Sequence, residues 1–452
     1  MSFPRYPKYK PSGVEWLGEV PEHWQVDRLK RSVASCKNGT WGDDATGGQD
    51  DVVCVRVADF DRRRLQVDLA NPTLRSVPVK DRAGRLLAEG DLLLEKSGGG
   101  ETSPVGFVVR WAHSVPAVCS NFVARLEPAE RVSSSYWCYA HAAAYAVGIN
   151  TRSIKQTSGI QNLDSQQYLD EPFLFPPLAE QRAIAAFLDR ETAKIDALIA
   201  EQEKLIELLA EKRQAVISHA VTKGLDPAAP MKPSGVEWLG DVPAHWHVIK
   251  MKWVARMESG HTPDKKVPAY WEDGSIPWVS LNDTGYLQDH DYIAETAYNV
   301  TEIGIANSSA HLLPPRSVVF SRDATIGRCA ITTREMAVSQ HFIAWVCGDT
   351  VVPEYLLLRL RSMSFELERL TTGATLKTIG MPEVRTLVTP LPPRAEQLAI
   401  VEYVGSQKLS LDGLLSEAEQ AIILLRERRY ALISAAVTGQ IDVRNAVPET
   451  AA

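Results

Sequence analysis

KPSGVEWLGEVPEHW occupies residues 10–24, and KPSGVEWLGDVPAHW occupies residues 232–246. The two segments differ at only two of fifteen positions and begin 222 residues apart. A second repeat pairs residues 176–184 with residues 392–400 at an offset of 216 residues, and it continues to residues 222 and 438. Solenoid repeats recur every 20–50 residues or so. The longer spacing therefore predicts a tandem duplication of a whole domain.

The segments between these anchors have diverged almost completely. Simple drift after duplication would erode all parts alike, so we favour a preserved scaffold that presents two different recognition segments. We call these variable segments readers. The repeat predicts these segments: an anchor at 1–24, reader 1 at 25–175, a helical spacer at 176–225, a linker with the second anchor at 226–246, reader 2 at 247–391, a second helical spacer at 392–442 and a flexible tail at 443–452.

The composition is that of a globular protein, with 45% hydrophobic and 23% charged residues among 452. The chain has no apolar run near the roughly 18 residues that span a bilayer and no visible secretory signal, so we expect a cytoplasmic location. The six cysteines form no C-x-x-C pair, which argues against a zinc site or a disulfide framework. The net charge of −7 argues against strong nonspecific binding to nucleic acid.

Each repeated tail predicts a long helix, because Pro-Pro precedes it and the following stretch contains no further proline. Apolar residues then recur at alternating three- and four-residue steps, which is typical of a coiled-coil seam. The expected seam residues are Leu198, Leu205, Leu209 and Val216 in the first helix, and Leu414, Ala421, Leu425 and Leu432 in the second. Such a helix needs a partner. We expect the two helices to pair antiparallel, with the readers at opposite ends; the alternative is that each helix packs on its own reader.

The readers are rich in strand-like runs, such as residues 51–57, 91–94, 105–109, 276–280, 317–320 and 337–346. Short helices are expected at residues 135–146 and 353–370. The fold class predicted from these patterns is α+β. It has two mixed α/β domains and two long antiparallel coiled-coil spacer helices in a pseudo-two-fold tandem repeat.

Known catalytic motifs are absent from the sequence. There is no P-loop, G-x-G-x-x-G, H-E-x-x-H or amino-methyltransferase N-P-P-Y motif. Asp264 and Glu272 only loosely resemble nuclease carboxylates, and an ordinary surface loop explains them better. His23 and His245 belong to the repeat, so a structural role is favoured over metal binding. We therefore predict no catalytic residue and no metal ligand.

Polar and aromatic residues gather in the glycine-rich loops of both readers. Arg, Lys, Asn and Gln are the side chains that pair with base edges, although for any one of them an ordinary solvated loop is the simpler interpretation. The candidates in reader 1 are Lys37, Asn38, Thr40, Trp41, Lys96, Ser97, Arg152, Lys155, Gln156, Gln161 and Asn162. Those in reader 2 are His261, Thr262, Lys265, Lys266, Tyr270, Trp271, Arg322, Thr325, Gln340 and Lys377.

The anchors SGVEWLGEVPEHW and SGVEWLGDVPAHW, the helix openings PPLAEQRAIAAFLD and PPRAEQLAIVEYV, and the two seams together resemble the DNA-specificity subunit of type I restriction–modification systems. The resemblance covers nearly the whole chain. Reader 2 adds SGHTPDKKVPAYWEDGSIPWVSLNDTG, SRDATIGRCAI and VSQHFIAW, whereas reader 1 is more divergent.

The resemblance implies two target-recognition domains that each read half of a split double-stranded DNA target. It also implies two methyltransferase subunits, which would bind S-adenosylmethionine, and two motor–nuclease subunits for restriction. Residues 180–190 and 396–403 are candidate partner-binding faces. Two alternatives stay open: a stand-alone methyltransferase or nuclease with unrecognised motifs, and a protein scaffold without a DNA role. Reader charges of +2 over residues 25–165 and −2 over residues 247–380 predict weak, salt-sensitive DNA binding by the chain alone.

Overall fold

The computed structural model describes residues 3–100, 102–156, 159–373 and 377–446. The chain forms two compact units. Unit 1 combines residues 1–203 with residues 419–452, and unit 2 is residues 204–418. Each unit holds one reader together with part of both long helices, α4 (Leu178–Lys223) and α10 (Arg394–Val437). Residues 447–452 of the expected flexible tail lie outside the described residues.

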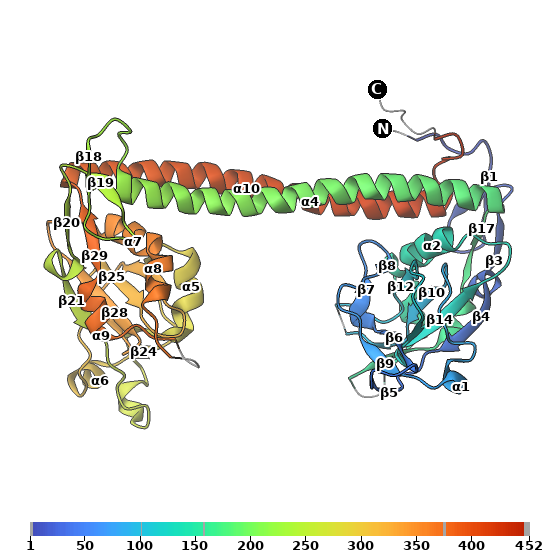
Figure 1. The fold of residues 1–452 in the computed structure, drawn as a ribbon, viewed down its shortest axis with the longest axis horizontal. Helices are drawn as coiled ribbons and strands as arrows, with labels where there is room; N and C mark the ends of the chain where they lie inside the picture. The colour runs from blue at the N-terminus through green and yellow to red at the C-terminus, as the bar shows by residue number, and fades with distance from the viewer. Residues whose placement is uncertain (1–2, 101, 157–158, 374–376, 447–452) are drawn as a thin grey trace. The chain divides into compact units, whose positions relative to one another are not determined.

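The two long helices run antiparallel within each unit, as the sequence predicted (Figure 1). In unit 1 Arg429 of α10 lies 3.3 Å from Asp196 of α4, and Arg426 lies 3.6 Å from Glu203. In unit 2 Arg213 of α4 lies 3.3 Å from Asp412 of α10. Asp196 and Asp412 are repeat equivalents, as are Arg213 and Arg429, so the same ion pair occurs once in each unit.

Three of the eight predicted seam residues lie off the seam between the helices. Leu198, Leu205 and Leu414 are 45%, 40% and 46% exposed and so lie off the seam. The apolar neighbours that follow the two α4 leucines take the inward positions: Ile199 is buried and Ile206 is half-buried. Leu209 is buried, and Val216, Ala421, Leu425 and Leu432 are half-buried. At Leu198-Ile199 and Leu205-Ile206 two adjacent apolar residues fit the spacing equally well, which is why the spacing alone selected the exposed member of each pair.

Reader 1 is built on three sheets. The six-stranded sheet has the order β4 (Val33–Asn38), β14 (Val123–Pro128), β10 (Leu92–Glu95), β12 (Val108–Arg110), β8 (Gln66–Val67) and β7 (Phe60–Asp61). A four-stranded sheet contains β13 (Ala117–Cys119), β6 (Asp51–Val55), β9 (Leu74–Ser76) and β5 (Asp43–Asp44). A three-stranded sheet contains β11 (Ser97–Gly98), β16 (Gln161–Leu163) and β15 (Ile154–Gln156).

Short elements complete unit 1. Two-stranded pairs join β1 (Tyr9–Pro11) to β2 (Glu19–Pro21) and β17 (Pro172–Phe175) to β3 (Gln25–Arg28). The helices are α1 (Val79–Arg82), α2 (Ser134–Ala146) and α3 (Ser165–Leu169), and the 3-10 turns are η1 (Leu29–Ser32), η2 (Val57–Asp59) and η3 (Ile149–Ser153).

Reader 2 contains a sheet that corresponds to the six-stranded sheet of reader 1, but the strands and helices around it differ. Its five-stranded sheet has the order β21 (Ala255–Ser259), β28 (Phe342–Cys347), β25 (Ser317–Ser321), β26 (Cys329–Thr332) and β23 (Tyr292–Ile293). A second sheet contains β24 (Asn299–Val300), β22 (Ile276–Val279) and β27 (Ala337–Val338). Two-stranded pairs join β18 (Met231–Pro233) to β19 (Asp241–Pro243) and β20 (His247–Lys250) to β29 (Val388–Leu391).

The helices of reader 2 are α5 (Thr284–Asp289), α6 (Glu302–Ala306), α7 (Pro353–Ser362), α8 (Ser364–Arg369) and α9 (Met381–Thr386). Its 3-10 turns are η4 (Met251–Trp253), η5 (Pro268–Tyr270) and η6 (Leu281–Asp283). The helix predicted at residues 353–370 is therefore two helices, with Met363 between them. The predicted α+β class with two mixed domains and two spacer helices is confirmed.

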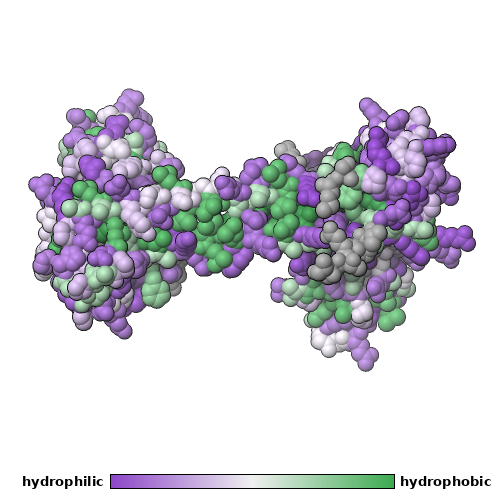
Figure 2. All heavy atoms as spheres, turned by 90° about the horizontal axis from the view of Figure 1, so that it is seen from above, coloured by the Kyte–Doolittle hydropathy of each residue, from purple (hydrophilic) through white to green (hydrophobic). Residues whose placement is uncertain are grey.

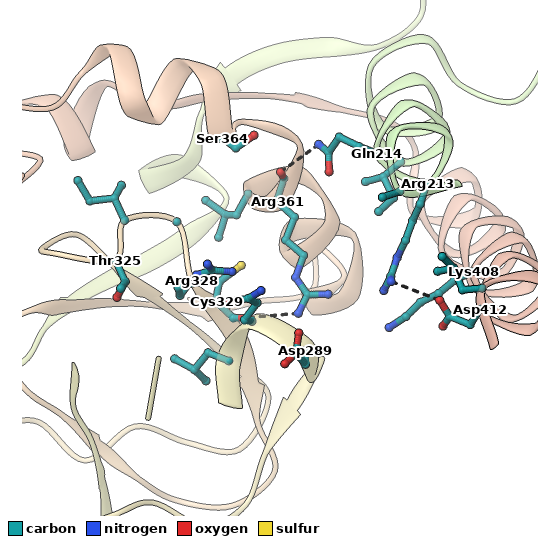
Figure 3. Close-up of a pocket in the computed structure, with 18 residues that line it drawn as sticks. Arg213, Gln214, Asp289, Thr325, Arg328, Cys329, Arg361, Ser364, Lys408 and Asp412 are labelled. Atoms are coloured by element: carbon teal, nitrogen blue, oxygen red, sulfur yellow. Dashed lines mark hydrogen bonds and ion pairs between the residues drawn. The ribbon is translucent and has the colours of Figure 1, made fainter. Parts of the chain in front are cut away.

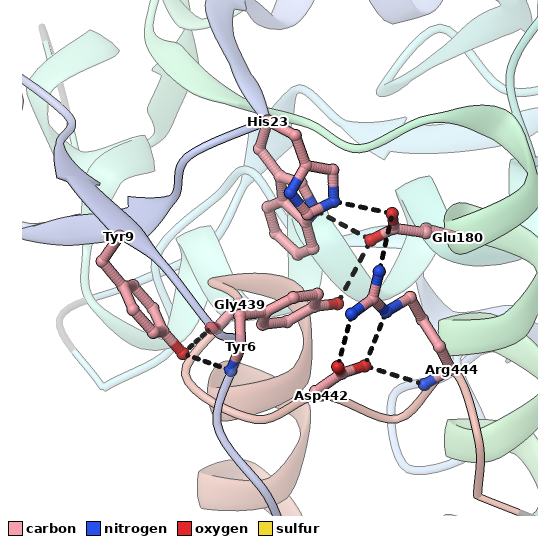
Figure 4. Close-up of polar contacts among 8 residues, drawn as sticks. Tyr6, Tyr9, His23, Glu180, Gly439, Asp442 and Arg444 are labelled. Atoms are coloured by element: carbon pink, nitrogen blue, oxygen red, sulfur yellow. Dashed lines mark hydrogen bonds and ion pairs between the residues drawn. The ribbon is translucent and has the colours of Figure 1, made fainter.

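Glu180, in the first turn of α4, holds the N-terminal anchor (Figure 4). Its carboxylate accepts from Trp24 Nε1 at 2.9 Å and from the Tyr6 hydroxyl at 3.3 Å, and it contacts His23 Nε2 at 2.7 Å. Burial and the neighbouring carboxylate raise the pKa of Tyr6 far above its usual range, so its hydroxyl stays a donor. A carboxylate also suits the positive end of the helix dipole. In unit 2 the equivalent Glu396 contacts His245 at 2.8 Å.

The glutamine after each of these glutamates holds the reader. Gln181 is buried, and its Oε1 accepts from the backbone N–H of Ser133, the N-cap of α2, at 3.0 Å. Gln397 does the same for Val352, the N-cap of α7, at 2.8 Å. Each glutamine also donates from Nε2 to the first proline carbonyl before its helix at 2.9 Å. One dipeptide therefore connects anchor, reader and long helix in both units.

Replacing either glutamine with alanine is expected to destabilise the unit that contains it. Gln181→Ala leaves the half-buried N–H of Ser133 and a buried carbonyl without partners, and Gln397→Ala leaves the buried N–H of Val352 and a buried carbonyl without partners. Each loss costs about 1–3 kcal/mol of unfolding free energy. Thermal and denaturant unfolding measure the loss. Gln420→Ala, at an exposed position of α10, is the matched control and should change little. Equal melting of all three variants would contradict the role given to the buried pair.

Candidate nucleic-acid interface

Three loops meet at one end of the central strands in each reader. In reader 1 the pairs Asn38↔Ala124 and Glu95↔Val123 bring the end of β4 and the end of β10 to the start of β14. In reader 2 the pairs Ser259↔Ile343 and Ser321↔Phe342 do the same for β21, β25 and β28. We call the resulting loop clusters edge 1 (residues 39–41, 96–99 and 120–122) and edge 2 (residues 260–262, 322–325 and 339–341).

A glycine opens the first loop of each edge because the backbone of the third loop is too close for a side chain. A Cβ on Gly39 would lie 2.1 Å from the Cys119 carbonyl oxygen, and a Cβ on Gly260 would lie 2.2 Å from the Ser339 carbonyl oxygen. The loops that follow these glycines therefore cross directly over the residues that precede β14 and β28. Readers with little sequence in common thus share this crossing.

Edge 1 gathers several of the predicted residues. Lys96 Nζ donates to Asn38 Oδ1 at 2.6 Å, and the Ser97 hydroxyl donates to Asn162 Oδ1 at 2.6 Å where β11 pairs with β16. The Arg75 guanidinium stacks on Trp41, 4.6 Å from the ring centroid. A cavity of about 500 Å³ opens here, lined by Trp41 and Phe122 among others.

Edge 2 is held by a chain of side-chain contacts. Thr262 Oγ1 contacts Gln340 Oε1, Gln340 Nε2 lies 3.2 Å from His341 Nε2, and His341 Nδ1 lies 2.8 Å from Asp323 Oδ2. Asp323 is buried and also accepts from the Thr378 hydroxyl. Arg322 donates to the carbonyl of Gln340 at 3.2 Å and to that of Ile379 at 3.1 Å, so its guanidinium braces the backbone.

Other predicted residues of reader 1 lie apart from edge 1 or serve it structurally. Gln161 is buried, and its Oε1 accepts from the Val105 N–H at 3.2 Å. The Gln161 oxygen therefore supports the loop that carries Val105, and a base contact by Gln161 stays a prediction. Arg152 pairs with Glu171 at 3.6 Å, and Lys155 pairs with Asp164 at 2.7 Å. Lys37 on β4 and Gln156 on β15 are exposed.

The remaining predicted residues of reader 2 flank edge 2. Lys377 pairs with Glu368 at 2.9 Å, while its carbonyl accepts from the Ala324 N–H at 2.9 Å. The segment with Lys265, Lys266, Tyr270 and Trp271 is tied to the edge by Trp278, whose Nε1 donates to the His261 carbonyl at 3.1 Å. Trp278 also packs edge-to-face on Trp271. Asp264 accepts from the Lys266 N–H at 2.9 Å, so this carboxylate shapes a turn.

Sequence reasoning named Gln340 in the third loop of edge 2 but missed His341 beside it and the two corresponding residues of edge 1. Asn121 and Phe122 in edge 1 stand where Gln340 and His341 stand in edge 2, directly before β14 and β28. Phe122 is 46% exposed. A usable signal was present, because both segments read Ser, then an amide residue, then one residue before an apolar strand: SNFVA and SQHFI.

A cavity of about 750 Å³ lies in unit 2 between reader 2 and the long helices (Figure 3). Its basic side chains are mostly paired: Arg213 lies 3.3 Å from Asp412, Lys408 lies 3.1 Å from Asp291, and Arg361 also contacts Asp291. Burial alone would raise the pKa of Asp291, but these two cations lower it overall. These ion pairs connect reader 2 to both long helices around the cavity.

Among the residues that the structure describes, no group of three or more His, Cys, Asp or Glu side chains is placed to hold a metal ion. Within the same part of the chain, no helix has the length and apolar content that crossing a membrane requires.

Comparison with known proteins gives consistent matches. Residues 243–406 match the family model of the type I restriction modification DNA specificity domain. The type I restriction enzyme MjaIX specificity subunit of Methanocaldococcus jannaschii is 29% identical over 169 residues, which cover 37% of this chain and only 39% of that protein. The MjaVIII specificity subunit of the same organism is 22% identical over 335 residues, which cover 73% of this chain and 75% of that protein.

Two solved structures share the fold. One, from a study of complex assembly and conformational transition of the type I R-M system, has a TM-score of 0.69 at 15% identity and covers 92% of this chain and 98% of its own. The other, the HsdS subunit from Thermoanaerobacter tengcongensis, has a TM-score of 0.55 at 16% identity, with coverage of 93% and 98%.

The glycine crossing in edge 2 can be tested by adding one methyl group. Gly260→Ala should lower the melting temperature of the chain, because its Cβ would overlap two backbone carbonyls that cannot move independently of β28. Gly285→Ala is the control on α5, where a Cβ meets nothing within 4 Å. That change should be neutral or stabilise by about 0.5–1 kcal/mol. A Gly260→Ala protein as stable as wild type would refute the tight crossing.

Proposed function

Because these comparisons confirm the resemblance seen in the sequence and identify the chain as a DNA-specificity subunit of type I restriction–modification systems, we propose that each reader recognises one half of a split DNA target. Edge 1 and edge 2 carry the base contacts. The spacer helices set the distance between the two half-sites, and the chain itself performs no chemistry.

The observation that carries this proposal is the contrast between the scaffold contacts, which we call the frame, and the loops of edge 1 and edge 2. The histidine contacts of Glu180 and Glu396, the amide contacts of Gln181 and Gln397 and the crossings at Gly39 and Gly260 occur in both units. The loops mounted on that frame differ almost completely. A frame that is kept while its loops vary suits two readers of different base sequences, since base contacts specify and the frame only positions them.

Affinity for DNA is shared with partner subunits in this proposal. Neither reader carries a strong positive charge, at +2 and −2, so phosphate contacts by the chain alone are few. The partners are methyltransferase subunits, which bind S-adenosylmethionine and flip the target adenine out of the duplex. Motor–nuclease subunits would join the same complex for restriction, and its place of action is the cytoplasm.

Exposed leucines on the long helices are the surface we assign to the methyltransferase subunits. Unit 1 presents Leu198 at 45% and Leu424 at 54% exposure, and unit 2 presents their repeat equivalents, Leu414 at 46% and Leu208 at 48%. Figure 2 shows hydrophobic residues gathered on the face of the helices turned to the viewer. Exposed apolar patches of this kind mark interaction sites. Two equivalent patches suit two identical partners.

The partner-binding faces expected at residues 180–190 and 396–403 are only partly accessible. Glu180, Gln181 and Gln397 are buried within their own units, whereas Leu398 and Tyr403 are 51% and 41% exposed. The exposed members are further apolar residues on the surface of α10 in unit 2. The buried members make the contacts within their own units that are described above.

Methylation mapping tests the proposed function directly. Genomic DNA from cells that express the chain with its methyltransferase subunits should carry methyladenine at one two-part motif. Exchanging residues 25–175 for another reader should change one half of that motif and leave the other half intact. The purified chain given S-adenosylmethionine and DNA should transfer no methyl group. Methylation by the chain alone, or a motif without two parts, would defeat the proposal.

Charged residues on the exposed leucines should block one partner at a time. Leu208→Lys with Leu414→Lys should reduce the number of methyltransferase subunits bound from two to one in native mass spectrometry, because each lysine ammonium would have to be desolvated at the interface. Leu198→Lys with Leu424→Lys should have the same effect in unit 1, and all four changes together should abolish binding. Lys212→Leu, which adds an apolar group at an exposed helix position, is the control. Full partner binding by the fourfold variant would locate the partner surface elsewhere.

A further inference from the structure

The side-chain amide of Gln340 is held at edge 2 from both ends. Its Oε1 contacts the Thr262 hydroxyl, and its Nε2 lies 3.2 Å from His341 Nε2. The hydroxyl donates to the amide oxygen, since an amide oxygen can only accept. Gln340 is nevertheless exposed, so the held amide faces outward from the third loop of the edge.

The buried Asp323 determines which way the amide faces. Its Oδ2 lies 2.8 Å from His341 Nδ1, so Nδ1 carries the ring proton and donates to the carboxylate. In the neutral imidazole His341 Nε2 is then an acceptor, and the N–H end of the Gln340 amide donates to it. Thr378 fixes the other oxygen of Asp323. A chain of hydrogen bonds therefore connects the buried Asp323 carboxylate through His341 to the exposed Gln340 amide.

The unused hydrogen-bonding capacity of Gln340 is one donor and one acceptor. A primary amide has two N–H groups and an oxygen with two acceptor positions. His341 uses one N–H, and Thr262 uses one acceptor position. In the major groove adenine presents an N7 acceptor beside an N6 donor, which a glutamine or asparagine amide pairs in bidentate fashion. Guanine offers two acceptors at this edge, cytosine a donor only, and thymine an acceptor beside a methyl group.

Edge 1 has an amide at the same place. Asn121 occupies the position of Gln340 and is exposed, and its side chain has no hydrogen-bond partner among the residues that the structure describes. Beside it Phe122 replaces His341 and lines the 500 Å³ cavity together with Trp41. An apolar ring next to an amide suits an A·T pair, because phenylalanine contacts the thymine methyl group. The two readers therefore share the chemistry at this position while their supports differ.

We propose that Gln340 reads an adenine in one half-site through its locked amide, that His341 and Asp323 are positioning residues for it, and that Asn121 reads an A·T pair in the other half-site. This inference rests on the proposed DNA-reading function and names its specificity-determining residues. The adenine that Gln340 reads is distinct from the adenine that is methylated, since the methylated base leaves the stack.

Methylation mapping of single variants tests the inference. Gln340→Ala, expressed with the methyltransferase subunits, should lose the requirement for A·T at one unmethylated position of one half-site, which would raise the number of methylated genomic sites by up to about four-fold as the other base pairs become acceptable. Asn121→Ala should relax one A·T position in the other half-site. Gln288→Ala, an exposed glutamine on α5, is the matched control and should leave the motif unchanged.

The positioning role of His341 has its own readout. His341→Ala should relax the same base position as Gln340→Ala, and the double variant should relax it no further, because residues that act through one contact are not additive. A merely structural role would lower the melting temperature without selecting that position. If Gln340→Ala abolishes methylation, duplexes with each of the four bases at that position measure the preference for adenine in vitro. That preference should fall on the order of 10-fold or more.

The outcomes separate this inference from the proposed function. Absence of a two-part motif for the wild-type chain would defeat the function itself. A two-part motif that Gln340→Ala leaves unchanged, or that it relaxes at a G·C position, would overturn the inference alone. An intact A·T requirement in His341→Ala would overturn the positioning role.

Discussion

Two adjacent side chains at the start of each long helix connect the parts of each unit. Successive residues of an α-helix point about 100° apart, so a Glu-Gln pair addresses two directions at once. Glu180 turns to the anchor and Gln181 to the reader, and Glu396 and Gln397 repeat this arrangement. Since both residues sit in the first turn, before the helix makes all its own hydrogen bonds, they join three segments without interrupting the helix.

The two units share some of the polar contacts at the start of their long helices, but not all of them. Glu180 satisfies the indole N–H of Trp24 at 2.9 Å, whereas the indole N–H of the equivalent Trp246 is buried without a hydrogen-bond partner among the described residues. Residues Tyr6 and Arg444 also approach Glu180, and their aligned positions in unit 2 carry no comparable side chain. The histidine contact and the glutamine contacts are the part common to both units.

The long helices, their antiparallel pairing and most reader strands could be predicted from the sequence, because each depends on local periodicity or on the repeat. Which member of an adjacent apolar pair lies on the seam could not be predicted. Leu198-Ile199 and Leu205-Ile206 offer an apolar residue to either phase, and only the facing helix selects between them. The glycine-rich loops of the sequence predicted the segments in which edge 1 and edge 2 lie. The distinction between buried Gln161 and exposed Asn121 required strand pairing between distant segments, which single-residue chemistry does not reveal.

The assembly of unit 1 from two separate stretches of chain affects the order in which the protein folds during synthesis. Unit 2 is continuous, whereas unit 1 needs residues beyond 418 to bury its core, among them Ile433, Ala436 and Val443. The backbone N–H of Asp442 also donates to the carbonyl of Pro4 at 2.7 Å. Reader 1 leaves the ribosome first but is completed last, after unit 2 has all its residues. In the interval its uncovered apolar surface is the part of the nascent chain most exposed to chaperones and to aggregation.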